Sequence, residues 1–172
     1  VEDLLELSRL ESSEGITRIR PIKPAKVIND AINYFQPAIE KKQHAVIKNI
    51  QADCPEILTD PDMLAKAVGN LLDNAVKYTP ENGRIEITVA ADAQNLSISI
   101  KDNGIGIPSE DLAQIFERFY RVDKSRSREM GGTGLGLSIV KHIVQTLKGD
   151  VSVTSKPEQG STFVIKLPVT HR

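Results

Sequence analysis

The order of helical and strand patterns along the 172 residues predicts a two-layer α/β sandwich. Three segments repeat apolar residues at three- and four-residue spacing, which is the period of helices that bury one face. Shorter segments alternate apolar and polar residues, as half-buried strands do. Because most of these strands come in pairs joined by short turns, we expect a mixed, mostly antiparallel sheet covered on one face by about three helices.

The start of the chain has the pattern of the end of a helix at residues 2–12, with Leu4 and Leu7 in an apolar stripe. This stripe has no partner within so short a piece, so we expect it to be half of an interface. A strand is predicted at 17–22. A helix is predicted from Pro24 to about residue 42, with a weakly alternating strand after it. The apolar face of this helix comprises Val27, Ile28, Ala31, Ile32, Phe35 and Ile39, and the strand covers 44–50.

A third helix is predicted at 61–78. Asp60 is placed to cap its first turn, and Pro61 suits the first helical position. The helix must end near Pro80, because the residue before a proline disfavours helical geometry. Its apolar face comprises Leu64, Val68, Leu71, Leu72 and Ala75.

The second half of the chain begins with two alternating strands joined at residues 92–95, a connection that suits a hairpin. The pattern is then broken by glycines and charges at 102–133, where only a short helix at about 109–116 is expected. A helix at 135–147 follows, and Gly149 ends it. The four predicted strands of this half are 85–89, 96–100, 150–155 and 161–168, the last two around a turn at 157–160.

Composition excludes several classes of function. The formal net charge of -1 gives no support to bulk binding of nucleic acid or of an acidic membrane. The single cysteine, Cys54, allows no internal disulfide and no cysteine cluster for zinc, which suits a reducing, cytoplasmic setting. No run of about 18 apolar residues is present. Since the chain begins at Val1, we expect a fragment of a longer protein.

Three polar residues of the 61–78 helix are candidates for a site. Asn70, Asn74 and Lys77 fall within about 60° of one another on the helix, roughly opposite its apolar face. Amide oxygens suit a hard cation that bridges phosphates, and a lysine suits a phosphate oxygen. The alternative is a solvated polar face.

A glycine-containing segment, DNGIGIP at 102–108, directly follows a predicted strand. Its glycines would let the backbone approach a flat ligand closely. The carboxylate of Asp102 could accept a hydrogen bond from an exocyclic amine. The alternative is a glycine turn with a capping aspartate.

A second glycine-rich segment, GGTGLG at 131–136, leads straight into a helix. N–H groups at a helix N-terminus form an anion site, whereas the alternative is a flexible hinge. A dinucleotide-binding fingerprint does not fit, because its third glycine position falls on Leu137, and no Gly-Lys pair exists for a P-loop. The motifs of protein kinases are also absent.

The segment between the two glycine-rich segments is basic. Such a segment could fold over a phosphate site as a lid and neutralise charge, or it could be a mobile charged loop. Its basic residues are Arg118, Arg121, Lys124, Arg126 and Arg128.

In combination, four motifs resemble the boxes of the sensor histidine kinase catalytic domain, which shares a superfamily with gyrase, Hsp90 and MutL. They are NLLDNAVKYT at 70–79, DNGIGIP at 102–108, FERFYR at 116–121 and GGTGLGLSIVKHIV at 131–144, in the family's order and spacing. The resemblance covers about residues 17–170, where GST at 160–162 is similar to a last glycine box. It implies a Bergerat-type ATP-binding fold at 17–172 with a lid at about 118–133, and the truncated end of a dimerisation helix at 1–16.

The resemblance also implies roles for individual residues. Asn74 would bind Mg²⁺, with Asn70 supporting it near the phosphates of ATP. Lys77 would contact a phosphate, and Tyr78 would lie near the base or the ribose. Asp102 would accept the adenine amine.

In the rest of the pocket, Gly104, Gly106 and Ile107 would shape the adenine site. Arg118 or Arg121 would touch the γ-phosphate, and the residues do not decide between them. The lid end and the phosphates would be held by Gly132, Thr133, Gly134, Leu135 and Gly136.

The position of Asn70 indicates the reaction type. Hydrolases of the superfamily have a glutamate there, and an amide cannot act as a base. The resemblance therefore implies slow hydrolysis and transfer of the γ-phosphate to a histidine on the dimerisation domain. None of His44, His142 and His171 has the sequence context of that acceptor, so this chain alone should not phosphorylate itself.

The resemblance implies two partners, which are the protein's own dimerisation domain and the receiver domain of a response regulator. It also implies that the parent is a homodimeric, membrane-anchored bacterial sensor, with this domain in its cytoplasmic portion. The fragment itself should touch neither membrane nor nucleic acid. Two rival functions stay open: a serine kinase of the anti-sigma-factor type, and a degenerate interaction module that binds nucleotide without catalysis.

Overall fold

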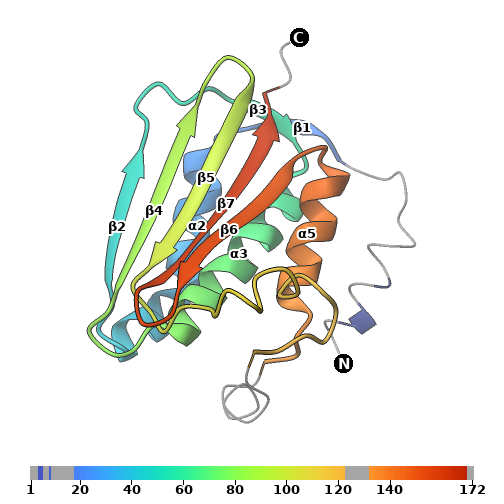
Figure 1. Cartoon of the computed structure of the whole chain (residues 1–172). Coiled ribbons are helices and arrows are strands. Elements are labelled where there is room, and N and C mark those ends of the chain that lie inside the picture. The colour runs from blue at the N-terminus through green and yellow to red at the C-terminus, as the bar shows by residue number, and fades with distance from the viewer. Residues whose placement is uncertain (1–3, 6–7, 9–17, 123–131, 170–172) are drawn as a thin grey trace.

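The computed structural model describes residues 4–5, 8, 18–122 and 132–169. Within these residues, the fold has two layers, with a five-stranded sheet on one side and helices on the other (Figure 1). Leu4, Leu5 and Ser8 are helical, whereas Leu7 and most of the predicted helix at 2–12 lie outside the described residues. The predicted α/β sandwich is confirmed.

Helices α2 (Pro24–Lys41), α3 (Pro61–Tyr78) and α5 (Gly136–Thr146) pack on one face of the sheet (Figure 1). The limits of α3 agree with the sequence prediction. The Asp60 carboxylate accepts hydrogen bonds from the N–H groups of Asp62 and Met63 at 3.0 and 3.1 Å, so it caps the helix as expected. No described helix is long and apolar enough to cross a bilayer.

The main sheet has the strand order β2-β4-β5-β7-β6. Only the β2–β4 pair is parallel, and the other three pairs are antiparallel. Asp92 closes the predicted β4–β5 hairpin, because its carboxylate accepts the N–H groups of Gln94 and Asn95, both at 2.7 Å. The strands are β2 (Ala45–Ile50), β4 (Arg84–Ala91), β5 (Asn95–Asp102), β6 (Asp150–Lys156) and β7 (Gly160–Pro168).

The structure differs from the sequence prediction at two places. Strand β3 (Ile57–Thr59), which pairs with β1 (Arg20–Ile22), was not predicted, because three residues are too few to show a period. The predicted helix at 109–116 is a series of turns instead. The Gln114 N–H bonds to the Asp111 carbonyl at turn spacing. So short a helix is marginal because its nucleation is costly.

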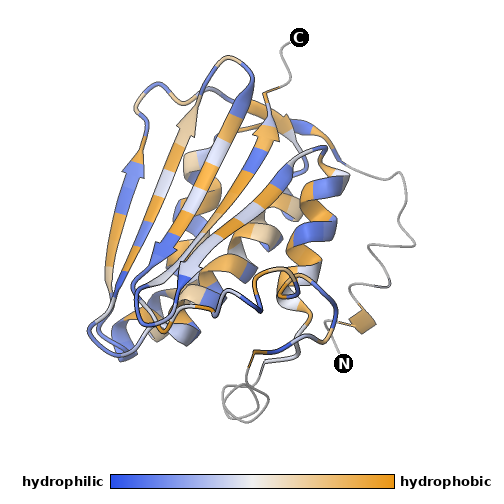
Figure 2. Ribbon diagram, viewed as in Figure 1, coloured by the Kyte–Doolittle hydropathy of each residue, from blue (hydrophilic) through white to orange (hydrophobic). Residues whose placement is uncertain are grey.

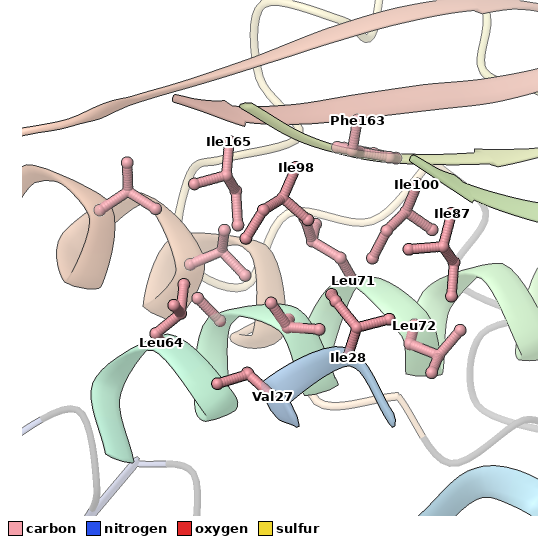
Figure 3. Packing of buried hydrophobic residues seen from close by; sticks show 14 of the residues in the cluster. Val27, Ile28, Leu64, Leu71, Leu72, Ile87, Ile98, Ile100, Phe163 and Ile165 are labelled. Atoms are coloured by element: carbon pink, nitrogen blue, oxygen red, sulfur yellow. The ribbon is translucent and has the colours of Figure 1, made fainter. Parts of the chain in front are cut away.

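The core lies between the sheet and the helices, as the alternation of hydrophobic and hydrophilic residues along the strands shows (Figure 2). Ile87, Ile100 and Phe163 are neighbours across three adjacent strands. They face Leu71 and Leu72 of α3 (Figure 3). This packing places α3 directly under the sheet, so the polar face of the helix turns toward the segments that follow β5.

Candidate nucleotide-binding site

A cavity of about 390 Å³ lies against the polar face of α3, which is a volume that suits a small molecule. Its other walls come from the glycine-containing segment 102–108, from residues 115–122 and from residues 132–137 at the start of α5. The hairpin between β6 and β7 closes one side. Segments far apart in the sequence therefore meet at one end of the helical layer.

The wall formed by α3 contains the predicted Asn70, Asn74 and Lys77, together with Asp73 and Tyr78. The helical period brings these side chains to one side. The face that could have been solvated is turned into the cavity. The Asn70 side-chain nitrogen is buried and has no hydrogen-bond partner among the described residues. A buried donor without a partner destabilises a protein by about 1–3 kcal/mol, so this amide indicates a ligand.

Asp73 was missed by sequence reasoning. Its carboxylate lies 2.6 Å from the Lys77 ammonium, and both side chains are about one-third exposed. The spacing of four residues between an acid and a lysine was a signal for this pair. The ion pair holds the lysine at the cavity wall.

Asp102 lies at the end of β5, where its side chain lines the cavity and is only 7% exposed. Its Oδ1 atom accepts hydrogen bonds from the N–H groups of Gly104 at 2.9 Å and Ser161 at 3.3 Å. Burial raises the pKa of the carboxyl, against the effect of these two hydrogen bonds. The position of Asp102 is thus set by β5, by the loop after it and by β7.

The glycines of this loop allow close backbone packing. A Cβ atom at Gly104 would lie 2.4 Å from the Tyr78 carbonyl oxygen, and a Cβ at Gly106 would lie 1.9 Å from the Lys156 carbonyl oxygen. Gly106 also has a φ of 69°, which favours glycine. Gly106 and Ile107 line the cavity, whereas Gly104 acts from outside it by letting the loop lie against α3.

Of the two candidate arginines, only Arg121 lines the cavity. Its guanidinium donates a hydrogen bond to the Gly132 carbonyl, which joins the two described ends of the predicted lid. Arg118 is exposed and lies outside the lining. The other basic residues, Lys124, Arg126 and Arg128, lie outside the described residues.

The start of α5 completes the cavity with Gly132, Thr133, Gly134 and Gly136. The first hydrogen bond within α5 runs from the Ile139 N–H to the Leu135 carbonyl at 2.9 Å. The N–H groups of residues 136–138 therefore have no acceptor within the helix. Such groups favour an anion. Leu135 differs from the prediction, because its side chain is buried in the core and does not line the cavity.

Comparison with known proteins identifies the family of the chain. A family model described as "Histidine kinase-, DNA gyrase B-, and HSP90-like ATPase" matches residues 59–171. The chain belongs to this ATPase family. The resemblance drawn from the four motifs is confirmed.

Relatives of the ATPase-family domain include sensor kinases. The sensor-like histidine kinase SenX3 of Mycolicibacterium smegmatis is 36% identical over 171 residues, which cover 98% of this chain and 44% of SenX3. The sensor histidine kinase WalK of Bacillus subtilis is 39% identical over 171 residues, which cover 98% of this chain and 28% of WalK. The chain therefore spans less than half the length of these relatives.

Solved structures of histidine kinases share the fold of the ATPase-family domain. Full-length ShkA in complex with AMPPNP is 27% identical with a TM-score of 0.86, over 98% of this chain and 35% of ShkA. The nucleotide-free catalytic domain of ThkA is 25% identical with a TM-score of 0.80, over 90% of this chain and all of that domain.

Several lining residues of the ATPase-family domain could not be distinguished from core or loop residues in the sequence. Most are apolar and come from separate segments, so their shared surface exists only after folding. Tyr120 is a polar exception, and its hydroxyl donates a hydrogen bond to the Asp111 carboxylate. The lining residues that were missed, besides Asp73, are Ile105, Pro108, Ile115, Tyr120, Val122, Leu137, Pro157, Ser161 and Phe163.

The substitution Asp102→Asn should raise the melting temperature of the nucleotide-free domain at pH 7. An acid whose pKa is raised in the folded state stabilises the fold below its unfolded pKa, and this contribution is lost as the pH rises through the folded pKa. The amide keeps an acceptor oxygen without the buried charge. The gain should vanish as the pH falls to about 3.9, the pKa of unfolded aspartate. Thermal unfolding across this range measures it, and a lower melting temperature at pH 7 would contradict the argument.

Proposed function

We propose that this domain binds ATP with Mg²⁺ and transfers the γ-phosphoryl group to a histidine on a separate dimerisation domain, as the catalytic part of a two-component sensor kinase. One observation carries the proposal: the amide and lysine face of α3, the buried carboxylate of Asp102 and the N-terminus of α5 line one cavity. The similarity to SenX3 and WalK over 98% of the chain supports it. So does the likeness to ShkA, whose structure is described in complex with AMPPNP.

The adenine end of the proposed site is at Asp102. Its carboxylate would accept a hydrogen bond from the exocyclic amine, and the Ser161 N–H orients that carboxylate. Ile107 and Phe163 supply apolar lining that suits a flat base. Tyr78, at the end of α3, would lie beside the base or the ribose.

The phosphate end of the proposed site lies between Lys77, Arg121 and the N-terminus of α5. The two side chains supply positive charge, and the helix supplies N–H groups that point at an anion. Arg121 is the better of the two arginine candidates, because it lines the cavity. Thr133 and the glycines at 132, 134 and 136 form the backbone wall on this side.

The amide oxygens on the α3 wall are ligands that suit Mg²⁺. Asn70 and Asn74 place two amide side chains on one wall, and the buried Asn70 side-chain nitrogen, which has no partner among the described residues, would donate to a phosphate oxygen beside the ion. Asn74 would hold the ion through its amide oxygen, and Asn70 would support it. When bound, Mg²⁺ would neutralise charge on the phosphates.

Transfer to a protein acceptor fits this wall better than hydrolysis does. Asn70 carries an amide, which cannot take a proton from water. The nearest carboxylate on α3 is that of Asp73, which is paired with Lys77. The domain would therefore orient and neutralise the triphosphate while the nucleophile, a histidine imidazole, comes from outside.

The proposal extends to the arrangement of the parent protein. Residues 1–16 would be the end of the dimerisation helix, residues 17–172 the catalytic domain and residues 118–133 its lid. The partners would be the kinase's own dimerisation domain and the receiver domain of a response regulator. The parent kinase would be a homodimer with this domain in the cytoplasm.

Radiolabelled phosphate tests the proposal. The domain is incubated with Mg²⁺ and ATP labelled at the γ-position, alone and as part of the parent chain that includes the dimerisation helices. We expect acid-labile label on the parent chain and none on the domain alone, because a phosphohistidine requires the missing acceptor.

Three results would contradict the proposal. Stable label on the domain alone would show an acceptor within this chain. Acid-stable label on a separate protein substrate would favour a serine kinase. A native domain that fails to bind a non-hydrolysable ATP analogue in calorimetry, with or without Mg²⁺, would show that the nucleotide site is degenerate.

A further inference from the structure

The C-terminus of α3 ends without the usual glycine. Thr79, the C-cap residue, is extended with φ of -94° and ψ of 124°, and Pro80 follows it. A helix that ends in this way cannot use the left-handed glycine motifs that satisfy the last carbonyl groups. The carbonyls of its last turn must find partners elsewhere, or they remain unsatisfied.

Lys42, from the connection between α2 and β2, supplies most of these partners. Its ammonium donates to the carbonyl oxygens of Val76 and Lys77, both at 2.8 Å, and of Thr79 at 3.1 Å. An ammonium has three protons, so the three acceptors match its capacity. Its positive charge also lies at the negative end of the α3 dipole.

His44, two residues after Lys42, contacts the same turn. Its Nε2 atom lies 3.1 Å from the carbonyl oxygens of both Thr79 and Pro80. Since both neighbours are acceptors, Nε2 carries the proton and donates. The side chain of His44 is buried. Gln43, which lies between Lys42 and His44 in the sequence, follows α2 in a left-handed conformation with a φ of 54°.

The turn that these side chains hold is part of the cavity wall. Lys77 and Tyr78 line the cavity. The Tyr78 carbonyl accepts the Ile105 N–H at 3.2 Å, which joins the turn to the loop after Asp102. A shift of this turn would therefore move both the proposed phosphate contact and the proposed adenine loop.

We propose that Lys42, assisted by His44, is a positioning residue for the nucleotide site: it fixes the last turn of α3 so that Lys77 and Tyr78 meet the ligand. Lys42 does not touch the nucleotide. The inference rests on the proposed function, because it requires that the cavity bind ATP.

Calorimetric titration of the domain with a non-hydrolysable ATP analogue and Mg²⁺ tests this role. The variant is Lys42→Met, which keeps most of the length of the side chain and removes the ammonium. The control is Lys48→Met, because Lys48 is an exposed lysine on nearby β2 that donates to Asn29 at 2.9 Å. Titration is done at a temperature where circular dichroism shows each variant folded. We expect affinity to fall about tenfold for Lys42→Met, through the lost charge-assisted hydrogen bonds, and to stay native for Lys48→Met.

The affinity of a folded variant is the readout that a purely structural role would not move, and amide chemical shifts locate the change that lowers it. In folded Lys42→Met, residues 76–79 and 104–105 should shift while the far ends of the sheet stay native. If Lys42→Met fails to fold, Lys42→Arg is used. It keeps the charge, but its planar fork cannot direct N–H groups to three converging carbonyls, so a severalfold loss of affinity with the same local shifts is expected.

A folded variant that binds the analogue with native affinity would overturn the positioning role and leave Lys42 as a structural cap alone. Failure of the proposed function is distinguishable, because the native domain and Lys48→Met would then also fail to bind.

Discussion

Asp102→Asn should weaken the binding of a non-hydrolysable ATP analogue by about one to two orders of magnitude. Only 7% of the residue is exposed, and it lines the cavity. A hydrogen bond to a charged group contributes about 1.5–3 kcal/mol, and each 1.4 kcal/mol is a factor of ten in affinity. In the proposed site, asparagine would also present an N–H₂ group where the adenine amine needs an acceptor. Isothermal titration of the folded variant measures the loss.

The matched control is Asp92→Asn. Asp92 also accepts two backbone N–H groups through one oxygen, from Gln94 and Asn95 at 2.7 Å, but it lies in the β4–β5 turn away from the cavity. The control should bind the analogue like the native domain. Equal binding by Asp102→Asn and the control would remove Asp102 from the adenine site.

Gly106→Ala should destabilise the domain by about 2–5 kcal/mol and abolish nucleotide binding. Its φ of 69° costs about 1–2 kcal/mol for a residue with a side chain. The added Cβ would lie 1.9 Å from the Lys156 carbonyl oxygen and 3.0 Å from the Pro157 Cα, so the backbone must move, at a cost of about 1–3 kcal/mol. The loop that moves carries the cavity lining at 105–108. Chemical denaturation and titration with the analogue measure the two effects.

Gly69→Ala is the control for a glycine substitution. Gly69 lies in the interior of α3, and a Cβ there would meet nothing within 4 Å. Alanine is about 0.5–1 kcal/mol more favourable than glycine in a helix, so this variant should be more stable than the native domain and should bind the analogue normally. If Gly106→Ala behaved like this control, the inference that close packing against the β6–β7 turn excludes a side chain at this position would be contradicted.

Periodicity was sufficient where an element is long or has clear ends. The limits of α3 could be predicted from the Asp60-Pro61 start and the Pro80 stop, because capping and proline geometry act within a few residues. The three-residue β3 could not be predicted, since it is strand only through its pairing with β1. The turns at 109–116 could not be distinguished from a helix in the sequence, because local composition cannot tell one helical turn from a series of turns.

The residues of the site also divide into those that local patterns predict and those that depend on tertiary packing. Asn70, Asn74 and Lys77 could be grouped in advance, because one helix fixes their mutual direction. Arg118 and Arg121 could not be separated, and Leu135 was assigned to the cavity although it packs in the core. In each of these cases the answer depends on which neighbouring segment covers the side chain.

The sequence by itself determined the α/β architecture, the polar face of α3 and the family, since these depend on local periods and on motifs in a set order. Only the tertiary structure decided that this face closes a cavity, that Asp73 pairs with Lys77, and that Lys42 holds the end of α3. The physical reason is that hydrogen bonds and burial act through space. Lys42 and Lys77 are 35 residues apart along the chain, and only packing of α2 against α3 brings them together.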